Sequence, residues 1–229
     1  MSFLLLTLIA ANLIVSYRGF EDYTFRNKYL FNVGGILKYR EFYRMITSGF
    51  LHANWTHLAF NMITFYVFYG IILNSDSLDN KNIFILYMLS LLFSNLFSLY
   101  SNKHHNSYSA LGASGAVSGV VYAGIILNPS ASIYLMFIPI PISAWLFGLA
   151  YLIYSMYGMQ RNNDNIGHEA HLGGAISGII ITIIMYPAVL QRSPLLIASL
   201  LLLFILFIVI KKFRPDLVEF DSFFKNRRY

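Results

Sequence analysis

Three short polar segments interrupt long apolar stretches of this chain, and their residue types suit acyl transfer. The first contains His57 and Asn61, the second contains Ser114 in a Gly-Ala-Ser-Gly sequence, and the third contains His171. A serine hydroxyl becomes a nucleophile when a base such as histidine takes its proton. Acyl transfer also needs donors for the oxyanion that develops on the attacked carbonyl. We therefore expect Ser114 and His171 to act together, with His57 and Asn61 as candidate donors.

The composition indicates a membrane protein. Apolar residues make up 57% of the 229 residues and charged residues only 11%, against about 25% charged in soluble domains. The mean hydropathy is +0.60. Cysteine is absent, which excludes disulfides, thiolate catalysis and cysteine-ligated metals. The net charge of +6 is expected to face lipid headgroups and not nucleic acid.

Seven stretches without Asp, Glu, Lys or Arg at their centres are expected to cross the bilayer, since a spanning helix needs about 20 apolar residues. They are residues 2–17, 53–75, 82–102, 111–127, 132–157, 170–191 and 193–210. Pro139 and Pro141 are expected to leave the start of the fifth irregular. The aromatic and charged segment 18–46 is expected to lie among headgroups.

We thus expect an all-α polytopic membrane protein with about seven transmembrane helices. It should form a single membrane domain, with a six-helix core over about residues 1–190, an additional helix over 193–210 and a basic tail over 211–229.

The expected topology brings the three polar segments together. If consecutive spans alternate in direction, the second, fourth and sixth run the same way, and their polar starts lie near one surface. Gly115 and Gly119 are four residues apart, as are Gly174 and Gly178 in the sixth span. Small residues at this spacing let two membrane helices approach closely. No Asp or Glu stands where it would orient the histidine of the sixth span, so a Ser–His dyad is expected.

The three segments, in this order, resemble motifs of the rhomboid family of intramembrane serine proteases. Residues 52–61 resemble its His-x4-His-x3-Asn element, residues 112–115 its Gly-x-Ser-Gly motif, and residues 170–178 its catalytic-histidine helix. The resemblance covers about residues 40–180. It implies that Ser114 is the nucleophile, that His171 is the general base, and that His57 and Asn61 assist the oxyanion. The implied substrates are transmembrane segments of other membrane proteins in the lipid bilayer.

Other residues are expected to have structural or gate roles, namely His52, Arg44, Phe60 and Trp145. Arg44 follows Tyr43 in a pair that resembles the family's Trp-Arg dipeptide, and the gate would lie between the second and fifth spans. Ser118 is a departure, because the family often has a tyrosine there that packs under the catalytic histidine. The seventh span resembles the family's six-plus-one variant.

Three other functions stay open at this stage. His168-Glu169-Ala170-His171 is superficially similar to the zinc motif His-Glu-x-x-His of a metal-dependent hydrolase, but its histidines are three residues apart and no acidic third ligand follows. A non-catalytic rhomboid-like protein that binds membrane substrates usually lacks the serine or the histidine. A small transporter would show inverted repeats. We expect no metal and no cofactor.

Two arguments about the membrane orientation disagree. Fourteen of the 16 Lys and Arg residues lie on the side of the polar starts, and the positive-inside rule places that side in the cytoplasm. The resemblance to bacterial rhomboids implies the opposite. We expect a multi-pass protein of the plasma (inner) membrane whose site opens to the exterior.

Overall fold

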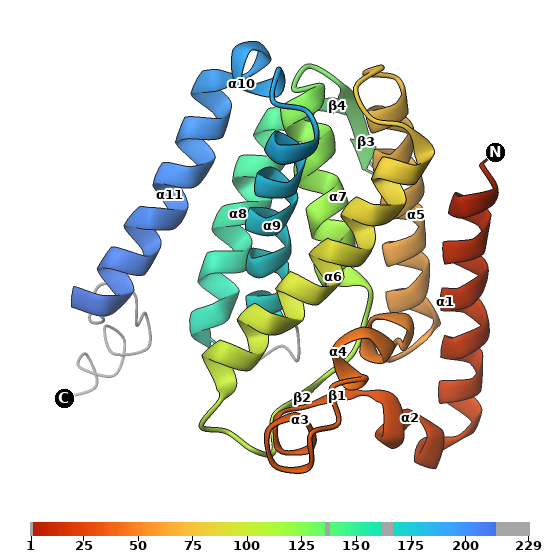
Figure 1. The fold of residues 1–229 in the computed structure, drawn as a ribbon. Helices are drawn as coiled ribbons and strands as arrows, with labels where there is room; N and C mark the ends of the chain where they lie inside the picture. Colours follow the sequence, from red (N-terminus) through yellow and green to blue (C-terminus); the bar gives the residue numbers. More distant parts are fainter. Residues whose placement is uncertain (1, 136–137, 162–166, 214–229) are drawn as a thin grey trace.

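A computed structural model describes residues 2–135, 138–161 and 167–213 of the chain (Figure 1). Seven long helices form the fold over these residues: α1 (Phe3–Glu21), α5 (Trp55–Leu73), α6 (Asn80–Asn102), α7 (Ser114–Leu127), α8 (Ala144–Arg161), α9 (His168–Met185) and α11 (Pro194–Phe213). Of these described helices, α1, α5, α6 and α9 are long and apolar enough to cross a membrane, and the other three contain shorter apolar stretches. The expected multi-pass α-helical membrane fold is confirmed.

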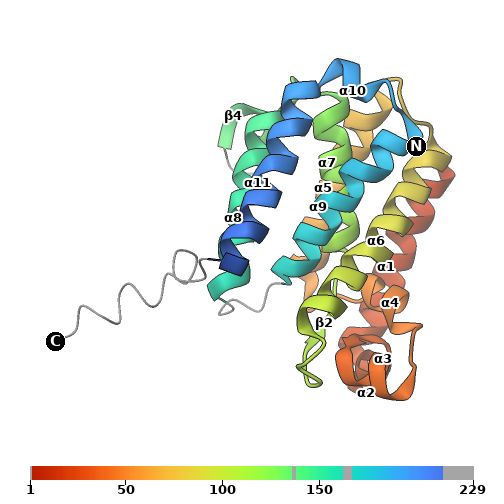
Figure 2. The same ribbon diagram turned by 60° about the vertical axis from the view of Figure 1, so that its left-hand side comes forward.

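Helix α7 lies at the centre of the fold. Every residue from Gly115 to Leu127 is buried, and α5, α6, α8 and α9 surround the helix in both views (Figures 1 and 2). Most of this helix consists of Gly, Ala, Ser and Val, which are small enough for four neighbours to approach. Helix α11 lies beside α8, at the edge of the bundle.

A compact cap lies at one end of the bundle, below α1 and α6 (Figures 1 and 2). It comprises α2 (Tyr23–Tyr29), strand β1 (Phe31–Asn32), α3 (Val33–Tyr39), α4 (Arg44–Thr47) and the 3-10 turn η1 (Ser48–Phe50). Strand β1 pairs antiparallel with β2 (Ser109–Ala110), which precedes α7. The cap is therefore joined directly to the segment that leads into Ser114.

Four predicted spans differ from the structure. The first was expected to end at residue 17, whereas α1 continues to Glu21. The fourth begins at Ser114 and not at residue 111, because Gly112 has φ +131°. The start of the fifth span, which we expected to be irregular, is not helical: β3 (Ser132–Leu135) pairs antiparallel with β4 (Ile138–Ser143), and α8 begins at Ala144. Prolines 139 and 141 lack the N–H that a helix interior needs.

The sixth predicted span also ends too late. Helix α9 stops at Met185, two residues before Pro187, and a short helix α10 (Val189–Arg192) follows. The residue before a proline is disfavoured in the helical region, so the chain leaves α9 at this point. The expected basic tail over 211–229 lies mostly outside the described residues.

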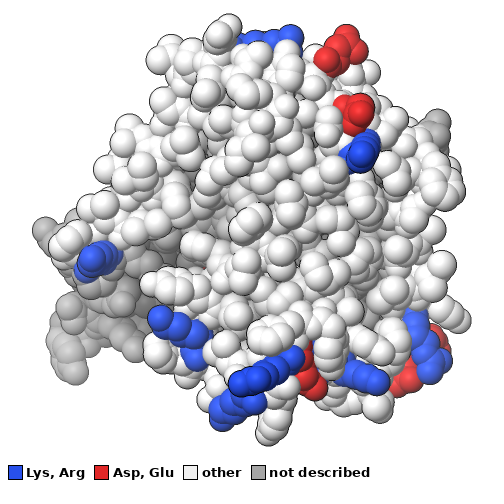
Figure 3. Space-filling view, in the orientation of Figure 1, with Lys and Arg blue, Asp and Glu red and all other residues white. Residues whose placement is uncertain are grey.

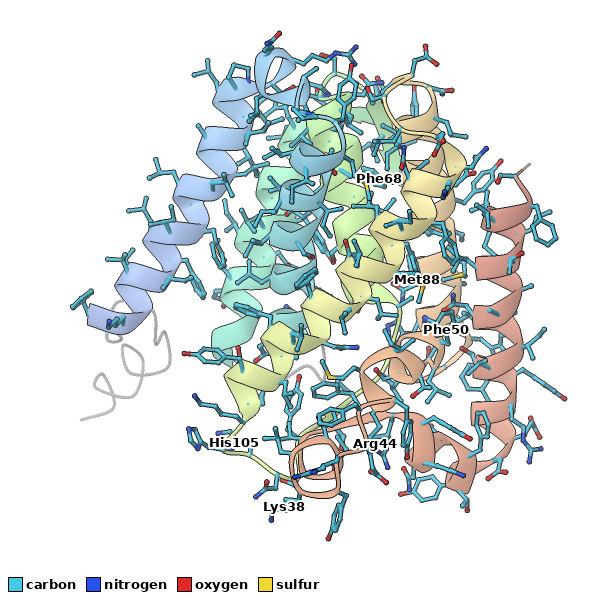
Figure 4. The ribbon with its side chains drawn as sticks, viewed as in Figure 1. Lys38, Arg44, Phe50, Phe68, Met88 and His105 are labelled. Atoms are coloured by element: carbon cyan, nitrogen blue, oxygen red, sulfur yellow. The ribbon has the colours of Figure 1, made fainter. Side chains whose placement is uncertain are left out.

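The face shown in Figure 3 has charged residues at its two ends and an uncharged belt between them. On the face shown, most of the described Lys and Arg residues gather at the end that carries the cap. Lys38, Arg44 and His105 all lie there (Figure 4). An uncharged belt with charge at its two rims suits a helical bundle embedded in a bilayer.

Candidate active site

A cavity of about 930 Å³ opens at the start of α5, α7 and α9. Ser114, His171, His57 and Asn61 all line it. The topology expected from the sequence therefore brings these four residues together, although they come from three different helices. Phe60 also lines the cavity, whereas Trp145 lies outside it with 44% of its surface exposed.

Glycines bring α7 and α9 into backbone contact, as their spacing predicts. A Cβ atom added at Gly115 would lie 3.3 Å from the carbonyl oxygen of Ala170, and one at Gly174 would overlap the carbonyl oxygen of Gly115. The pair Gly119 and Gly178 repeats this contact one turn further along. The first turn of α7, with its serine, consequently lies beside the first turn of α9, with its histidine.

The backbone before Ser114 is shaped by Gly112. This residue has φ +131°, which L side chains rarely adopt. A Cβ there would lie 2.7 Å from Cε1 and 3.0 Å from Nε2 of the His57 ring, and 3.8 Å from Oγ of Ser114. Glycine is thus required for both conformation and space, and it allows the His57 ring to lie close to Ser114. Because Ser114 is the first residue of α7, its N–H has no partner within the helix.

Hydrogen bonds orient both candidate oxyanion donors. The N–H of Ala53 donates to Nδ1 of His57 over 3.5 Å, so in the neutral ring the proton sits on Nε2, the nitrogen that faces Gly112. The side chain of Asn54 caps α5 by accepting from the His57 N–H. Nδ2 of Asn61 donates to the carbonyl oxygen of His57 over 3.1 Å, and the amide carries a second hydrogen.

His52 links α1 and, through Ser16, the 3-10 turn η1 to the residue before the candidate nucleophile. The N–H of Ala113 donates to its Nε2 over 3.3 Å, so Nδ1 carries the proton and donates to Oγ of Ser16 over 2.8 Å. Ser16 in turn donates to the carbonyl oxygen of Phe50. Burial, and then the nearby His57, lower the pKa of His52 to about 3. A neutral, fully buried His52 therefore has the contacts of the expected structural residue.

Arg44 holds the cap together and does not line the cavity. Its guanidinium contacts the Glu41 carboxylate over 2.7 Å and donates to the carbonyl oxygens of Asn27 and Leu30 over 2.8 Å each. These bonds tie α4 to the end of α2. Arg44 thus has the contacts of a structural residue, as the sequence predicts.

Two aromatic residues of α8, which sequence reasoning missed, line the cavity. The ring of Tyr151 lies 5.8 Å from the ring of His171, at 33° to its plane. Oγ of Ser118 lies 3.2 Å from the Tyr151 hydroxyl, and the ring of Phe147 stacks on that of Tyr151. The small side chain at 118 was a signal that another element supplies the aromatic contact.

A second missed pair joins the rim of the cavity to α9. The Tyr108 hydroxyl bonds to the Glu169 carboxylate, and burial, followed by the charge of Glu169, raises the pKa of Tyr108 well above its ordinary value. Glu169, the glutamate of the sequence that resembles the zinc motif, therefore bonds to a tyrosine. Among the described residues, no group of three His, Cys, Asp or Glu side chains is placed to hold a metal ion.

Comparison with known proteins gives consistent matches. The family model described as "Rhomboid domain" matches residues 39–188. Rhomboid protein 1, mitochondrial, of Saccharomyces cerevisiae is 35% identical over 139 residues, which cover 59% of this chain and 40% of the relative. RHOMBOID-like protein 12, mitochondrial, of Arabidopsis thaliana is 30% identical over 189 residues, which cover 74% of this chain and 54% of the relative. Rhomboid-like protein 11, chloroplastic, of the same plant is 27% identical over 150 residues, which cover 61% of this chain and 51% of the relative.

The match spans about half the length of these curated relatives. Their names do not support the expected plasma membrane, because they refer to mitochondria and chloroplasts. The matched family model, which covers most of the described bundle, agrees with the order of the motifs and with the multi-pass helical fold. This chain belongs to the rhomboid family.

Proposed function

We propose that this chain is an intramembrane serine endopeptidase with Ser114 as nucleophile and His171 as general base. The observation that carries the proposal is the glycine contact between α7 and α9, which sets the two side chains on one cavity. A nucleophile beside its base, within reach of oxyanion donors, is the arrangement that acyl transfer requires.

The reaction begins when Oγ of Ser114 attacks the carbonyl carbon of the scissile bond and His171 takes its proton. The oxyanion accepts hydrogen bonds from Nε2 of His57, from Asn61 and from the N–H of Ser114. His171 then protonates the leaving amine as the carbon–nitrogen bond breaks. Water, deprotonated by His171, then attacks the acyl carbon, and His171 returns this proton to Oγ of Ser114 as the ester bond breaks.

The substrate class we propose is a transmembrane segment of another membrane protein. The cavity wall between α5 and α8 includes Phe60, Thr64 and Phe147, which suits apolar side chains entering from the lipid. A helical segment satisfies its own backbone hydrogen bonds, so it must unwind before a carbonyl can be attacked. The extended stretch Ser109–Leu111 lines the same cavity and offers backbone groups to an unwound strand.

We further propose that residues 1–229 act as one membrane unit, with α11 added to a core that ends near α9. The membrane we propose is that of an organelle, because two of the relatives are mitochondrial and one is chloroplastic by name. Fractionation of cells that express a tagged chain tests this location.

The orientation stays a prediction, with the cavity facing away from the cytoplasm or matrix. Ser107→Cys at the exposed cap end and Asn74→Cys at the opposite end each give a chain with a single thiol, because cysteine is otherwise absent. An impermeant thiol reagent applied to the outer face of sealed membranes of known orientation labels only one of them. Labelling of the Ser107→Cys variant from the cytoplasmic or matrix side would instead agree with the positive-inside rule.

Cleavage of a reporter transmembrane substrate tests the proposal. Ser114→Ala and His171→Ala should each remove nearly all cleavage, whereas Ser107→Ala and His105→Ala, exposed on the loop before α7, should retain it. Full activity in Ser114→Ala or in His171→Ala would contradict the proposed dyad. Binding of substrate by the wild type without any cleavage would favour the non-catalytic alternative. Activity lost to a chelator and restored by zinc would favour the metal hydrolase.

A further inference from the structure

The imidazole of His171 has a ring contact with a tyrosine of α8, besides its contact with His168 of its own helix. Tyr151 lies 5.8 Å from His171 between ring centroids, in a tilted arrangement. Ser118, four residues after Ser114, is 1% exposed, and its hydroxyl contacts the Tyr151 hydroxyl over 3.2 Å. A larger side chain at 118 would occupy the space that Tyr151 fills.

Tyr151 is itself held on other sides. Phe147 stacks on it at 5.9 Å with an angle of 13° between the rings, and Tyr122 stacks at 6.3 Å with an angle of 24°. The hydroxyl of Tyr122 donates to the carbonyl oxygen of Gly148 over 2.8 Å, which fixes α8 to α7 at this level. A ring fixed by two stacked neighbours and a hydroxyl contact is a rigid support.

We infer that Tyr151 is a positioning residue for the general base: its ring holds the His171 imidazole in the orientation that points toward Ser114. This inference rests on the proposed function of the dyad. A histidine ring that can rotate spends time in orientations from which it cannot accept the serine proton. Contact with one face of the imidazole limits that rotation, and productive geometry is a large part of the rate.

The support also links the base to the wall of the cavity. Phe147 lines the cavity and contacts Phe68 of α5 at 5.9 Å, so the aromatic series Phe68, Phe147, Tyr151 and His171 runs from α5 through α8 to α9. The distance between α5 and α8, and the orientation of His171, are therefore set by the same series of contacts.

Three substitutions distinguish the contribution of the Tyr151 ring from that of its hydroxyl. Tyr151→Phe keeps the ring, Ser118→Ala removes only the hydroxyl partner, and Tyr151→Leu removes the ring. For the purified full chain with a reporter transmembrane substrate, the first two should keep kcat within about threefold of the wild type. Tyr151→Leu should lower kcat by about 10- to 100-fold and change KM by less than about threefold, because the main effect of the ring is on the orientation of the base.

Tyr66→Leu provides the matched control, since this tyrosine of α5 is 52% exposed and does not line the active-site cavity; it should retain wild-type kcat. If Tyr151→Leu is not recovered folded, Tyr151→Met takes its place with the same expected result. An unchanged kcat in a folded ring-deleted variant, or an equal loss in Tyr151→Phe, would overturn the inference. Ser114→Ala, measured alongside, keeps the two claims apart: if it stays active, the proposed dyad has failed, and not only the role of Tyr151.

Discussion

Replacing Gly174 by alanine perturbs the contact on which the proposed dyad depends. The added Cβ would lie 2.9 Å from the carbonyl carbon of Gly115, whereas two carbon atoms in contact prefer about 3.5–4.0 Å. The same Cβ would overlap the carbonyl oxygen of Gly115, so helices α7 and α9 would have to separate by at least about 0.6–1.1 Å. A misplacement of about 1 Å can cost roughly 10²-fold in rate. We therefore expect Gly174→Ala to lower kcat by about 10²-fold, and Gly174→Leu to abolish cleavage while the protein still inserts.

The assay is cleavage of a reporter transmembrane substrate by purified protein, with the thermal unfolding midpoint measured on the same samples. Gly70→Ala is the matched control, because it is also a glycine within a membrane helix and a Cβ there meets no atom within 4 Å. It should retain activity. A folded Gly174→Ala variant with kcat within about threefold of the wild type would refute the reasoning, because α7 and α9 would then not need this close approach.

Three further substitutions test the surroundings of the site. Asn61→Ala should lower kcat by roughly 10²-fold in the cleavage assay with KM little changed, as expected for loss of one oxyanion donor; an unchanged kcat would assign Asn61 to packing. His52 has a folded pKa of about 3, below the ordinary value near 6.5, so its stabilising contribution is complete above about pH 6.5 and is lost as pH falls toward 3. Unfolding measured against pH should show a wild-type loss of up to about 1.4 kcal/mol per pH unit there, and His52→Gln should lack this part of the slope; identical slopes would contradict the assignment. Arg44→Lys should lower the free energy of unfolding by about 1.5–3 kcal/mol, because lysine cannot reproduce the forked contacts of Arg44; an unchanged unfolding midpoint would show that those contacts contribute little.

The sequence was sufficient for the parts of the fold that follow from local rules. Long apolar stretches predicted the helices, and the glycine spacing predicted the contact between Gly115 and Gly174. The alternation of spans predicted that Ser114 and His171 would face one cavity. Each of these rests on helix geometry and on hydrophobicity, which a single sequence carries in full.

The remaining features depend on contacts between distant segments. The pairing of β3 with β4 was not predicted, because proline breaks a helix but does not specify what forms in its place. Tyr151 looked like one more aromatic residue of an apolar span, and only the packing of α8 against α7 and α9 brings its ring to His171. The Tyr108–Glu169 bond likewise joins the loop before α7 to the start of α9. Phe147, and not Trp145, lines the cavity because of how α8 is rotated.

The central claim is that Ser114 is a nucleophile activated by His171. Labelling by a fluorophosphonate probe tests it most directly, because the probe bonds only to an activated hydroxyl. Mass spectrometry of the labelled wild type should find the adduct on Ser114. The label should be absent in Ser114→Ala and nearly absent in His171→Ala, and the double variant should lose no more than either single one. An adduct on another residue, or full labelling of His171→Ala, would contradict the account.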